Sequence, residues 1–226
     1  MHHLLPLPDE YTAVPTSSGC RIFNAALAQG QCGSCAAFAV ATAAAMRLCI
    51  HDRRDFIPSP FRLFDCADTT CDKGLSLPSA AAIAQFGLGD IDASAHRYGL
   101  PCDHRHEHRL RELLSPRLIT DPHRIRRALY RHGPMPGAVR HDATRHALVV
   151  VGWGPGRWIV QNSWGEDWGD GHGRGNISQA ALLGAVDVEE TRQHALVLIF
   201  ACIMAMIALL AAEVVKAYRD RRKEGV

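Results

Sequence analysis

The stretch QGQCGSCAAF, residues 29–38, has two cysteines, Cys32 and Cys35, separated by a glycine and a serine. A pair at this spacing is typical of a zinc knuckle, a redox-active dithiol, a disulfide that braces a loop, or a nucleophilic thiol with a structural neighbour. The segment that starts at Cys35, CAAFAVATAAAMRLC, has no glycine or proline, which predicts an α-helix over residues 35–49. Cys35 would then begin this helix, where the helix dipole favours a thiolate.

The zinc and redox alternatives both need support from elsewhere in the chain. Cys66 and Cys71 have four residues between them and could supply a second pair of zinc ligands. A redox dithiol is typical of a βαβ context, whereas no strand flanks the predicted alanine-rich helix. A nucleophilic thiol needs a base, and a further group that orients the base.

Composition narrows the class of protein. The chain has 226 residues, enough for a domain with its own core, and its net charge of +2 gives no indication of nucleic-acid binding. Eight cysteines are many for an ordinary cytosolic enzyme and indicate an oxidised, disulfide-bonded framework.

Turn residues and hydrophobic patterns predict helices in the first part of the chain and strands in the second. Residues 1–31, rich in proline, serine and glycine, are predicted to form a loop. The later predictions are a helix over 76–86, a polar histidine-rich loop over 102–111, a helix over 121–132, and strands over 146–151 and 157–161. Helices followed by strands indicate an α+β fold in two halves.

Two downstream residues meet the requirements of a nucleophilic thiol. His146 opens the apolar segment HALVVVGWG, and Asn162 follows the next predicted strand in WIVQNSWGEDWG. If the two strands pair as a hairpin, His146 and Asn162 become neighbours, and the amide of Asn162 can hold one ring nitrogen of the imidazole. The set Cys35, His146 and Asn162 is therefore a candidate for nucleophilic catalysis at a carbonyl carbon.

Three sequence blocks, QGQCGSC, HALVVVGWG and QNSWGEDWG, resemble the active-site blocks of the papain-like cysteine peptidases. The resemblance implies that Cys35 is the nucleophile, that His146 is the general base and acid, and that Asn162 orients the imidazole. It also implies that Gln29 donates a hydrogen bond to the oxyanion and that Trp164 covers the His–Asn pair. The implied fold has a helical lobe and a β-rich lobe.

Within this family the chain is most similar to the cathepsin B group. The segments LPDEYTA, MRLCIHD and PCDHRHEH resemble, in turn, the mature start, the segment after the catalytic helix, and the beginning of the occluding loop. That loop binds a substrate's C-terminal carboxylate, which makes His104 and His106 candidates for substrate binding. A solvated polar loop that includes His108 is the alternative. Gly74, in CDKG, is implied to offer its backbone to the substrate.

The similarity to cathepsin B also implies a disulfide framework. The implied pairs are Cys20–Cys49, Cys32–Cys71 and Cys66–Cys102. In this arrangement Cys32 fixes the loop beside Cys35, and a disulfide between Cys32 and Cys35 would contradict the assignment. No metal ion or other cofactor is implied.

Several features depart from the family pattern. Ala36 stands where the family usually has tryptophan, and the loss of a large ring is expected to open the cleft. Arg145 precedes the candidate histidine, where a cation disfavours the imidazolium. No propeptide is recognisable before the domain. After Asn176 the usual final strands are expected to be largely replaced by an anchor.

The predicted charge state of Cys35 follows from its two neighbours. A helix N-terminus and an imidazolium both lower the pKa of a thiol, so we expect rapid alkylation of Cys35 at about pH 5–6. A thiol that reacted only above about pH 8 would instead point to a protein without catalytic activity.

The C-terminal segment differs in composition from the rest of the chain. Residues 195–212, ALVLIFACIMAMIALLAA, contain no charge and predict a transmembrane helix over 195–215; a buried core helix is the alternative. The tail over 216–226 is basic, which indicates a cytoplasmic side, whereas the N-terminal MHHLLPLPDE lacks a recognisable signal peptide. The peptidase domain is predicted over 1–190, with a helical lobe at about 29–115 and a β-rich lobe at about 116–188. The sequence is consistent with this domain on either side of the membrane.

The leading hypothesis is a membrane-anchored thiol peptidase that acts on peptides or proteins. A catalytically weak or inactive papain-fold membrane protein, used for binding or entry, is the alternative. Ala36 and Arg145 favour the alternative, and the intact Cys–His–Asn–Gln set favours the enzyme. A related Cys–His–Asn acyl transferase is disfavoured, because CGSC and NSWG together are peptidase blocks. A compact anchored protease would suit a viral membrane.

Overall fold

The computed structural model describes the parts of the chain that carry the candidate site. The described residues are 6–15, 19–84, 88, 97–99, 101–102, 113–142, 144–190, 204 and 206. The chain divides into two compact units, residues 1–189 and residues 190–226. The predicted transmembrane helix over 195–215 lies outside the described residues, apart from Met204 and Met206, which are helical and exposed.

The helix predicted after the CGSC motif forms the centre of the first unit. It is α1 (Cys35–Asp52), and it ends where Arg53 adopts a left-handed conformation with φ 56°. Its alanines are almost all buried, because small side chains let the helix approach its neighbours closely on several sides. Within the described ranges, α1 alone is long and apolar enough to cross a membrane, but 72% of it is buried inside the protein, as in a core helix.

Three further helices begin at residues whose side chains accept a hydrogen bond from the first turn. Ser76 Oγ accepts from the backbone N–H of Ser79 at 3.2 Å, and Asp121 Oδ1 accepts from that of Arg124 at 2.8 Å. The helices are α2 (Pro60–Asp65), α3 (Leu77–Ala84) and α4 (Pro122–His132). The prediction of α4 is confirmed, α3 falls within its predicted range, and α2 was not predicted.

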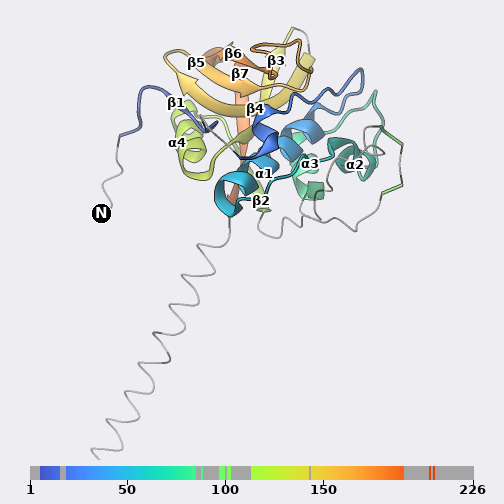
Figure 1. Cartoon of the computed structure of the whole chain (residues 1–226), viewed down its shortest axis with the longest axis horizontal. Helices are drawn as coiled ribbons and strands as arrows, with labels where there is room; N and C mark the ends of the chain where they lie inside the picture. Colours follow the sequence, from blue (N-terminus) through green and yellow to red (C-terminus); the bar gives the residue numbers. More distant parts are fainter. Residues whose placement is uncertain are drawn as a thin grey trace, which may run out of the picture. The chain divides into compact units, whose positions relative to one another are not determined.

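One antiparallel sheet forms the second layer of this unit (Figure 1). Its strands follow the order β2-β7-β3-β4-β5-β6, and β1 pairs with β4 off this path. The strands are β1 (Tyr11–Thr12), β2 (Leu113–Ile119), β3 (Met135–His141), β4 (Thr144–Gly154), β5 (Arg157–Gln161), β6 (Arg174–Ser178) and β7 (Leu182–Glu190). Two short 3₁₀ helices, η1 (Arg21–Asn24) and η2 (Gln179–Ala181), complete the described elements.

The hairpin predicted from HALVVVGWG and WIVQ is confirmed as β4 and β5, with Val150 opposite Val160.

The close approach of β1 to β4 explains why HALVVVGWG has a glycine at position 152. A Cβ on Gly152 would lie 2.4 Å from the carbonyl oxygen of Tyr11, so a side chain there would push β1 away. β1 also corrects the prediction that residues 1–31 form only loop, and η1 lies in the same range.

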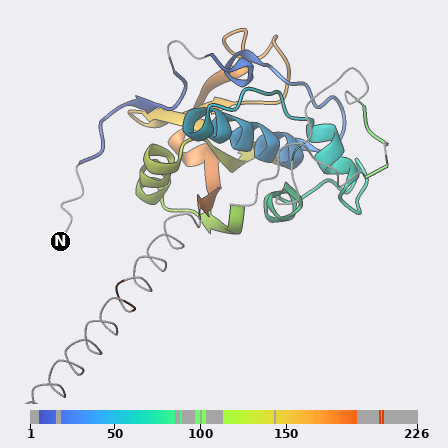
Figure 2. The ribbon, with the colours of Figure 1, turned by 60° about the horizontal axis from the view of Figure 1, so that its bottom comes forward.

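Side chains on the two faces of β4 belong to two different cores. Val149 and Val151 pack with α1, whereas Leu148 and Val150 pack with Leu129 of α4. This alternation follows from the two-residue period of a strand. In Figure 2, α1 runs across the unit, with α2 and α3 near one end and α4 near the other. The first residue of α1 therefore lies at the edge of the helical core.

The strands after β5 correct one expectation from the sequence. The final strands were expected to be largely lost after Asn176, but β6 spans that residue and β7 pairs with β3. The polar character of RGNIS concealed β6, because it is an edge strand with only partly buried side chains.

A buried ionic cluster joins α1, α4 and β7. Arg47 Nη2 lies 3.3 Å from Asp187 Oδ1, and His132 Nδ1 lies 3.1 Å from the same oxygen. The side chains of Arg47 and Asp187 are only 9% and 10% exposed. Burial raises the pKa of Asp187, but the hydrogen bond from His132 and the charge of Arg47 outweigh it, and the net pKa is lowered.

We predict that Asp187→Asn lowers the free energy of unfolding by about 3 kcal/mol at pH 7, because the buried guanidinium of Arg47 then loses the carboxylate that lies 3.3 Å from it. Because the folded pKa of Asp187 is depressed, its contribution is complete above the unfolded value of about 3.9 and is lost as the pH falls through the folded value. Urea unfolding between pH 3 and pH 7 measures both effects.

The matched control is Asp55→Asn. Asp55 pairs with Arg21 at 3.2 Å, but these side chains are 37% and 60% exposed. An exposed pair contributes no more than about 1 kcal/mol. Equal losses for the two variants would contradict the role assigned to the buried cluster.

Candidate active site

The loop before α1 is held by a disulfide and by a close backbone contact. Cys32 is bonded to Cys71, and the Gly33 N–H donates to the carbonyl oxygen of Cys71 at 3.0 Å. A Cβ on Gly33 would lie 2.5 Å from that oxygen and 3.0 Å from the Cα of Gly74. Only glycine therefore allows the two segments to meet here. This contact fixes the chain two residues before Cys35.

Cys35 is the first residue of α1 and is not in a disulfide. Its sulfur accepts hydrogen bonds from the N–H groups of Ala147 and Ala36, and the Ala147 contact reaches it from β4. Burial raises the pKa of the Cys35 thiol, and these N–H groups lower it by less, so the net pKa is raised. The expected low pKa is therefore not found, because desolvation outweighs the helix terminus.

His146 and Asn162 are neighbours, although 15 residues separate them in the chain. His146 Nε2 lies 2.7 Å from Asn162 Oδ1, and the same oxygen accepts from the backbone N–H of Ser163 at 2.8 Å. The Ser163 contact identifies the amide oxygen, which accepts only. His146 Nε2 must then carry a hydrogen, and Nδ1 keeps its lone pair.

The charge of His146 is set mainly by burial. Burial lowers the pKa of His146, the hydrogen bond to Asn162 raises it by less, and the nearby ring of His141 lowers it further. The histidine and the thiol are therefore both neutral near pH 7. Such a pair can exchange a proton when a substrate arrives, with the imidazole as the base.

Trp164 covers the imidazole. The two rings stack with centroids 4.7 Å apart and an interplanar angle of 28°. Trp168 and His141 each pack edge-on against the Trp164 indole, with ring centroids 5.9 Å and 5.2 Å away. The cover shields the His146–Asn162 hydrogen bond from water, which strengthens it.

Gln29 is held with one amide hydrogen left unused. Its Nε2 donates to the carbonyl oxygen of Cys32 at 2.8 Å, and its Oε1 accepts from Ser163 Oγ at 2.6 Å. An amide nitrogen has two hydrogens, so a second donor remains. With the N–H of Cys35, which belongs to the first turn of α1, this donor can stabilise an oxyanion.

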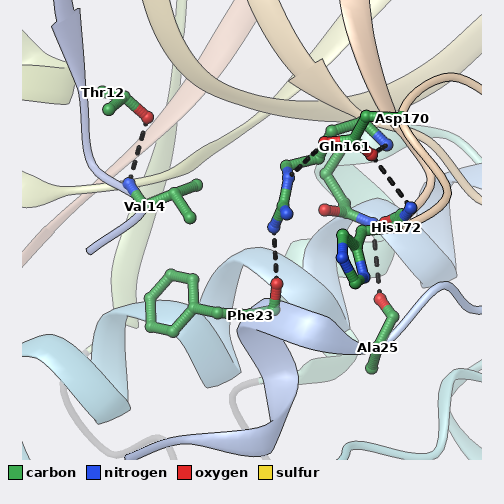
Figure 3. Close-up of polar contacts among 8 residues, drawn as sticks. Thr12, Val14, Phe23, Ala25, Gln161, Asp170 and His172 are labelled. Carbon is green, nitrogen blue, oxygen red and sulfur yellow. Dashed lines mark hydrogen bonds and ion pairs between the residues drawn. The ribbon is translucent and has the colours of Figure 1, made fainter. Parts of the chain in front are cut away.

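A second set of contacts fastens the segment before Gln29 to the loop after Asn162 (Figure 3). Gln161 Nε2 donates to the carbonyl oxygens of His172 at 2.7 Å and Ala25 at 3.3 Å. Arg174 Nη1 donates to the carbonyl oxygen of Phe23 at 2.5 Å. These bonds connect the segment that leads to Gln29 and Cys35 with the segment that contains and follows Asn162.

Tyr98 and Ser34 contribute to the site in a way that no motif indicated. The Tyr98 hydroxyl donates to the carbonyl oxygen of Gln29 at 2.9 Å and lies 2.5 Å from Ser34 Oγ. Because the phenol has one hydrogen, Ser34 must donate to it. The ring packs edge-on against Phe61 and Phe64, at 4.9 and 5.5 Å. Tyr98 thus ties together both ends of the loop from Gln29 to Ser34.

Three expectations about single residues need correction. Arg145 does not lower the pKa of the His146 imidazole, because adjacent residues on a strand point to opposite faces. The cation-forming neighbour that lowers this pKa is His141. Ala36 is only 1% exposed, so the missing ring opens no cleft. The Gly74 N–H already donates to the carbonyl oxygen of Thr70 at 2.9 Å, so only the Gly74 carbonyl, which also accepts from Thr69 Oγ1 at 2.6 Å, keeps a lone pair for a substrate.

The other predicted site residues have mixed outcomes. The structure contains the disulfides Cys20–Cys49, Cys32–Cys71 and Cys66–Cys102, the same pairs that the resemblance implied. Because Cys32, Cys66 and Cys71 are oxidised, they cannot form the zinc site considered from spacing. His104, His106 and His108 lie outside the described residues.

A family model settles the class of this fold and site. The model of the papain family of cysteine proteases matches residues 12–139 and 117–183. This chain belongs to the papain family. A "cysteine protease" of Blomia tropicalis is 26% identical in an alignment 182 positions long, which covers 63% of this chain and 54% of that protein. The "viral cathepsin" of Heliothis zea nuclear polyhedrosis virus is 28% identical in an alignment 208 positions long, which covers 78% of this chain and 55% of that protein.

The chain spans about half the length of the curated relatives it matches. Solved papain-family structures share its fold at low identity. A structure from work on the mite allergens Blo t 1 and Der p 1 matches with a TM-score of 0.68 and 20% identity, over 84% of this chain and 73% of that one. Procathepsin L 3 of Tenebrio molitor larval midgut matches with a TM-score of 0.63 and 24% identity, over 82% and 71%.

We predict that Tyr98→Phe lowers kcat for hydrolysis of a fluorogenic peptide about fivefold and leaves KM nearly unchanged. The ring contacts remain, but the hydroxyl no longer positions the Gln29 backbone, and one lost hydrogen bond of this kind is worth roughly 1 kcal/mol. Steady-state kinetics give the kcat and KM split.

The control is Tyr130→Phe, which removes a hydroxyl from an exposed ring on α4. It should leave both constants unchanged. A Tyr98→Phe enzyme with the original kcat, or with a raised KM alone, would show that Tyr98 does not position the oxyanion loop.

Proposed function

We propose that this protein is a thiol peptidase in which Cys35 attacks the carbonyl carbon of a peptide bond. The observation that carries the proposal is the hydrogen bond from His146 Nε2 to Asn162 Oδ1, which leaves the basic Nδ1 lone pair available. Cys35 begins α1 next to Ala147, the residue that follows His146. A nucleophile, a base and an orienting group are thereby present together.

Each chemical step has a residue to perform it. His146 Nδ1 accepts the thiol proton as the Cys35 sulfur forms a bond to the carbonyl carbon. The oxyanion receives the Cys35 N–H and the second hydrogen of Gln29 Nε2. His146 returns the proton to the leaving amine, the C–N bond breaks, and a thioester remains. Water, deprotonated by His146, then releases the acid and restores the thiol.

A non-catalytic papain-fold protein used for binding or entry is the second candidate. The observations that favour it are the raised pKa of Cys35 and the internal hydrogen bonds of the Gly74 backbone. A thiol that is neutral at rest is a slower nucleophile than a preformed thiolate. The two candidates differ in whether proton transfer to His146 occurs at a useful rate when a peptide binds.

A cathepsin B-like subtype is a finer proposal that rests on sequence. PCDHRHEH resembles the start of an occluding loop, so His104 and His106 would bind the substrate's C-terminal carboxylate and direct removal of dipeptides. The backbone of Gly74 and the indole of Trp164 would border the bound peptide. The alternative is an endopeptidase with an open cleft.

The membrane anchor and the domain boundaries are also proposals. The apolar segment 195–215 would form one transmembrane helix between a peptidase domain over 1–190 and a basic tail over 216–226. A viral membrane is one proposed location. Two of the relatives are named viral cathepsins, and these names refer to no membrane. The side of the membrane that carries the domain is left open.

The central test uses four variants of the full chain and a Phe–Arg fluorogenic peptide. Cys35→Ala and His146→Ala should abolish turnover, because they remove the nucleophile and the base. Asn162→Ala should lower kcat, and Gln29→Ala should lower it about a hundredfold by removing an oxyanion donor. Turnover that survives in Cys35→Ala would contradict the proposal.

The pH dependence of alkylation tests the charge state of Cys35. Because burial keeps the thiol neutral at rest in either candidate, this measurement no longer separates a peptidase from a non-catalytic protein, and only turnover does so. Since burial raises the pKa of this thiol, labelling by iodoacetamide should be slow at pH 5–6 and should rise with pH beyond the ordinary value of about 8.5. Peptide mass spectrometry measures the rate at Cys35 alone. Rapid labelling at pH 5–6 would instead demonstrate a preformed thiolate–imidazolium pair.

The anchor is tested by carbonate extraction of membranes that contain the full chain. The chain should stay in the pellet, and a chain truncated after residue 190 should move to the supernatant. Release of the full chain would contradict the anchor. Asn176, in the sequence Asn176-Ile177-Ser178, is exposed on β6, so a glycan there would show that the domain faces the lumen.

A further inference from the structure

A groove near the candidate active site contains two arginines that lie opposite each other on the neighbouring strands β3 and β4. Its volume is about 440 Å³, and its lining includes Arg140 of β3, Arg145 of β4 and two leucines, Leu118 and Leu183. Arg140 and Arg145 are direct partners in the register of β3 and β4. Both side chains are exposed. Like charges in this relationship destabilise a sheet, so the pair is unfavourable unless an anion lies between them.

The groove is continuous with the site. Ala138 and Ala147 are the next partners on the same face of the two strands, and Ala147 donates its N–H to the Cys35 sulfur. Ala138 also lines the groove. Arg145 directly precedes His146 in the chain but points to the other face of β4. Cys35 packs against the same core cluster as Ala138 and Ala147, so it lies on the face of β3 and β4 that carries the arginine groove.

The two arginines keep their charge available. In the part of the chain that the structure describes, neither forms an ion pair with a carboxylate. The acidic residue nearest to them in the groove, Asp142, is 91% exposed and lies 3.6 Å from His141 Nδ1. Arginine forks bind carboxylates through two parallel hydrogen bonds, and this geometry selects a planar anion.

We propose that Arg140 and Arg145 bind the carboxylate of an acidic side chain in the substrate and so select peptides with glutamate or aspartate beside the bond that is cut. This inference rests on the proposed peptidase function. Leu118, which is 59% exposed, and Leu183 offer an apolar wall to the methylene groups of that side chain. The two arginines are specificity residues and take no part in bond cleavage.

The test compares peptides that differ only by glutamate and glutamine. The pair is placed in turn at each of three positions before and two positions after the cleavage site of a fluorogenic peptide. The wild-type chain should prefer glutamate at one position about tenfold in kcat/KM, and the preference should fall as salt is raised. The double variant Arg140→Gln/Arg145→Gln should lose this preference, while Arg124→Gln, an exposed arginine on α4, should keep it.

Binding to Cys35→Ala separates the two proposals. Fluorescence anisotropy measures the affinity of the same labelled peptides for this variant, in which no cleavage is expected. Stronger binding of the glutamate peptide, lost with the two arginines, supports the arginine site even if the wild type shows no turnover, in which case only the peptidase proposal fails.

Three results would overturn the inference. They are equal binding of glutamate and glutamine peptides by Cys35→Ala, cleavage by the wild type without a preference at any position, and a preference that persists in the double variant. Thermal unfolding checks the double variant itself. Since the change removes two opposed charges from adjacent strands, its Tm should stay the same or rise.

Discussion

The contact between α1 and β4 is the constraint on which the site depends. An alanine-rich helix can lie close to a strand, because no large side chain keeps the two backbones apart. The contact brings the first residue of α1 within hydrogen-bond distance of the Ala147 N–H. Cys35 and Ala147, the residue after His146, come from distant parts of the sequence, and they meet only because this helix packs on this strand. Larger residues along α1 would separate them without changing either catalytic group.

Hydrogen bonds then fix each group within that frame. Asn162 sets the tautomer of His146, and Ser163 serves both halves of the site, since its N–H binds Asn162 and its hydroxyl binds Gln29. The disulfide Cys32–Cys71 and the phenol of Tyr98 hold the loop that carries the oxyanion donors. Desolvation is the cost of this packing, because it keeps the thiol and the imidazole neutral at rest.

How much could be predicted from the sequence differs between elements. The helix at Cys35, the helix capped by Asp121 and the β4–β5 hairpin carry strong local signals, and all three form as expected. β6 and β1 were missed because edge strands with polar residues lack hydrophobic alternation. Tyr98 was missed because its role depends on a tertiary contact with residues more than sixty positions away. The pKa of Cys35 was misjudged for the same reason: burial is not visible in a motif.

The resting site is expected to have one protonation state, with His146 neutral and its hydrogen on Nε2. Nitrogen-15 NMR of the full chain with labelled histidine, at pH 7, observes this directly. The His146 Nε2 should show a bonded proton and Nδ1 the shift of an unprotonated nitrogen, and Asn162→Ala should disturb that pattern while Asn176→Ala leaves it intact. A protonated Nδ1, or an imidazolium at pH 7, would contradict the assembly of the site described above.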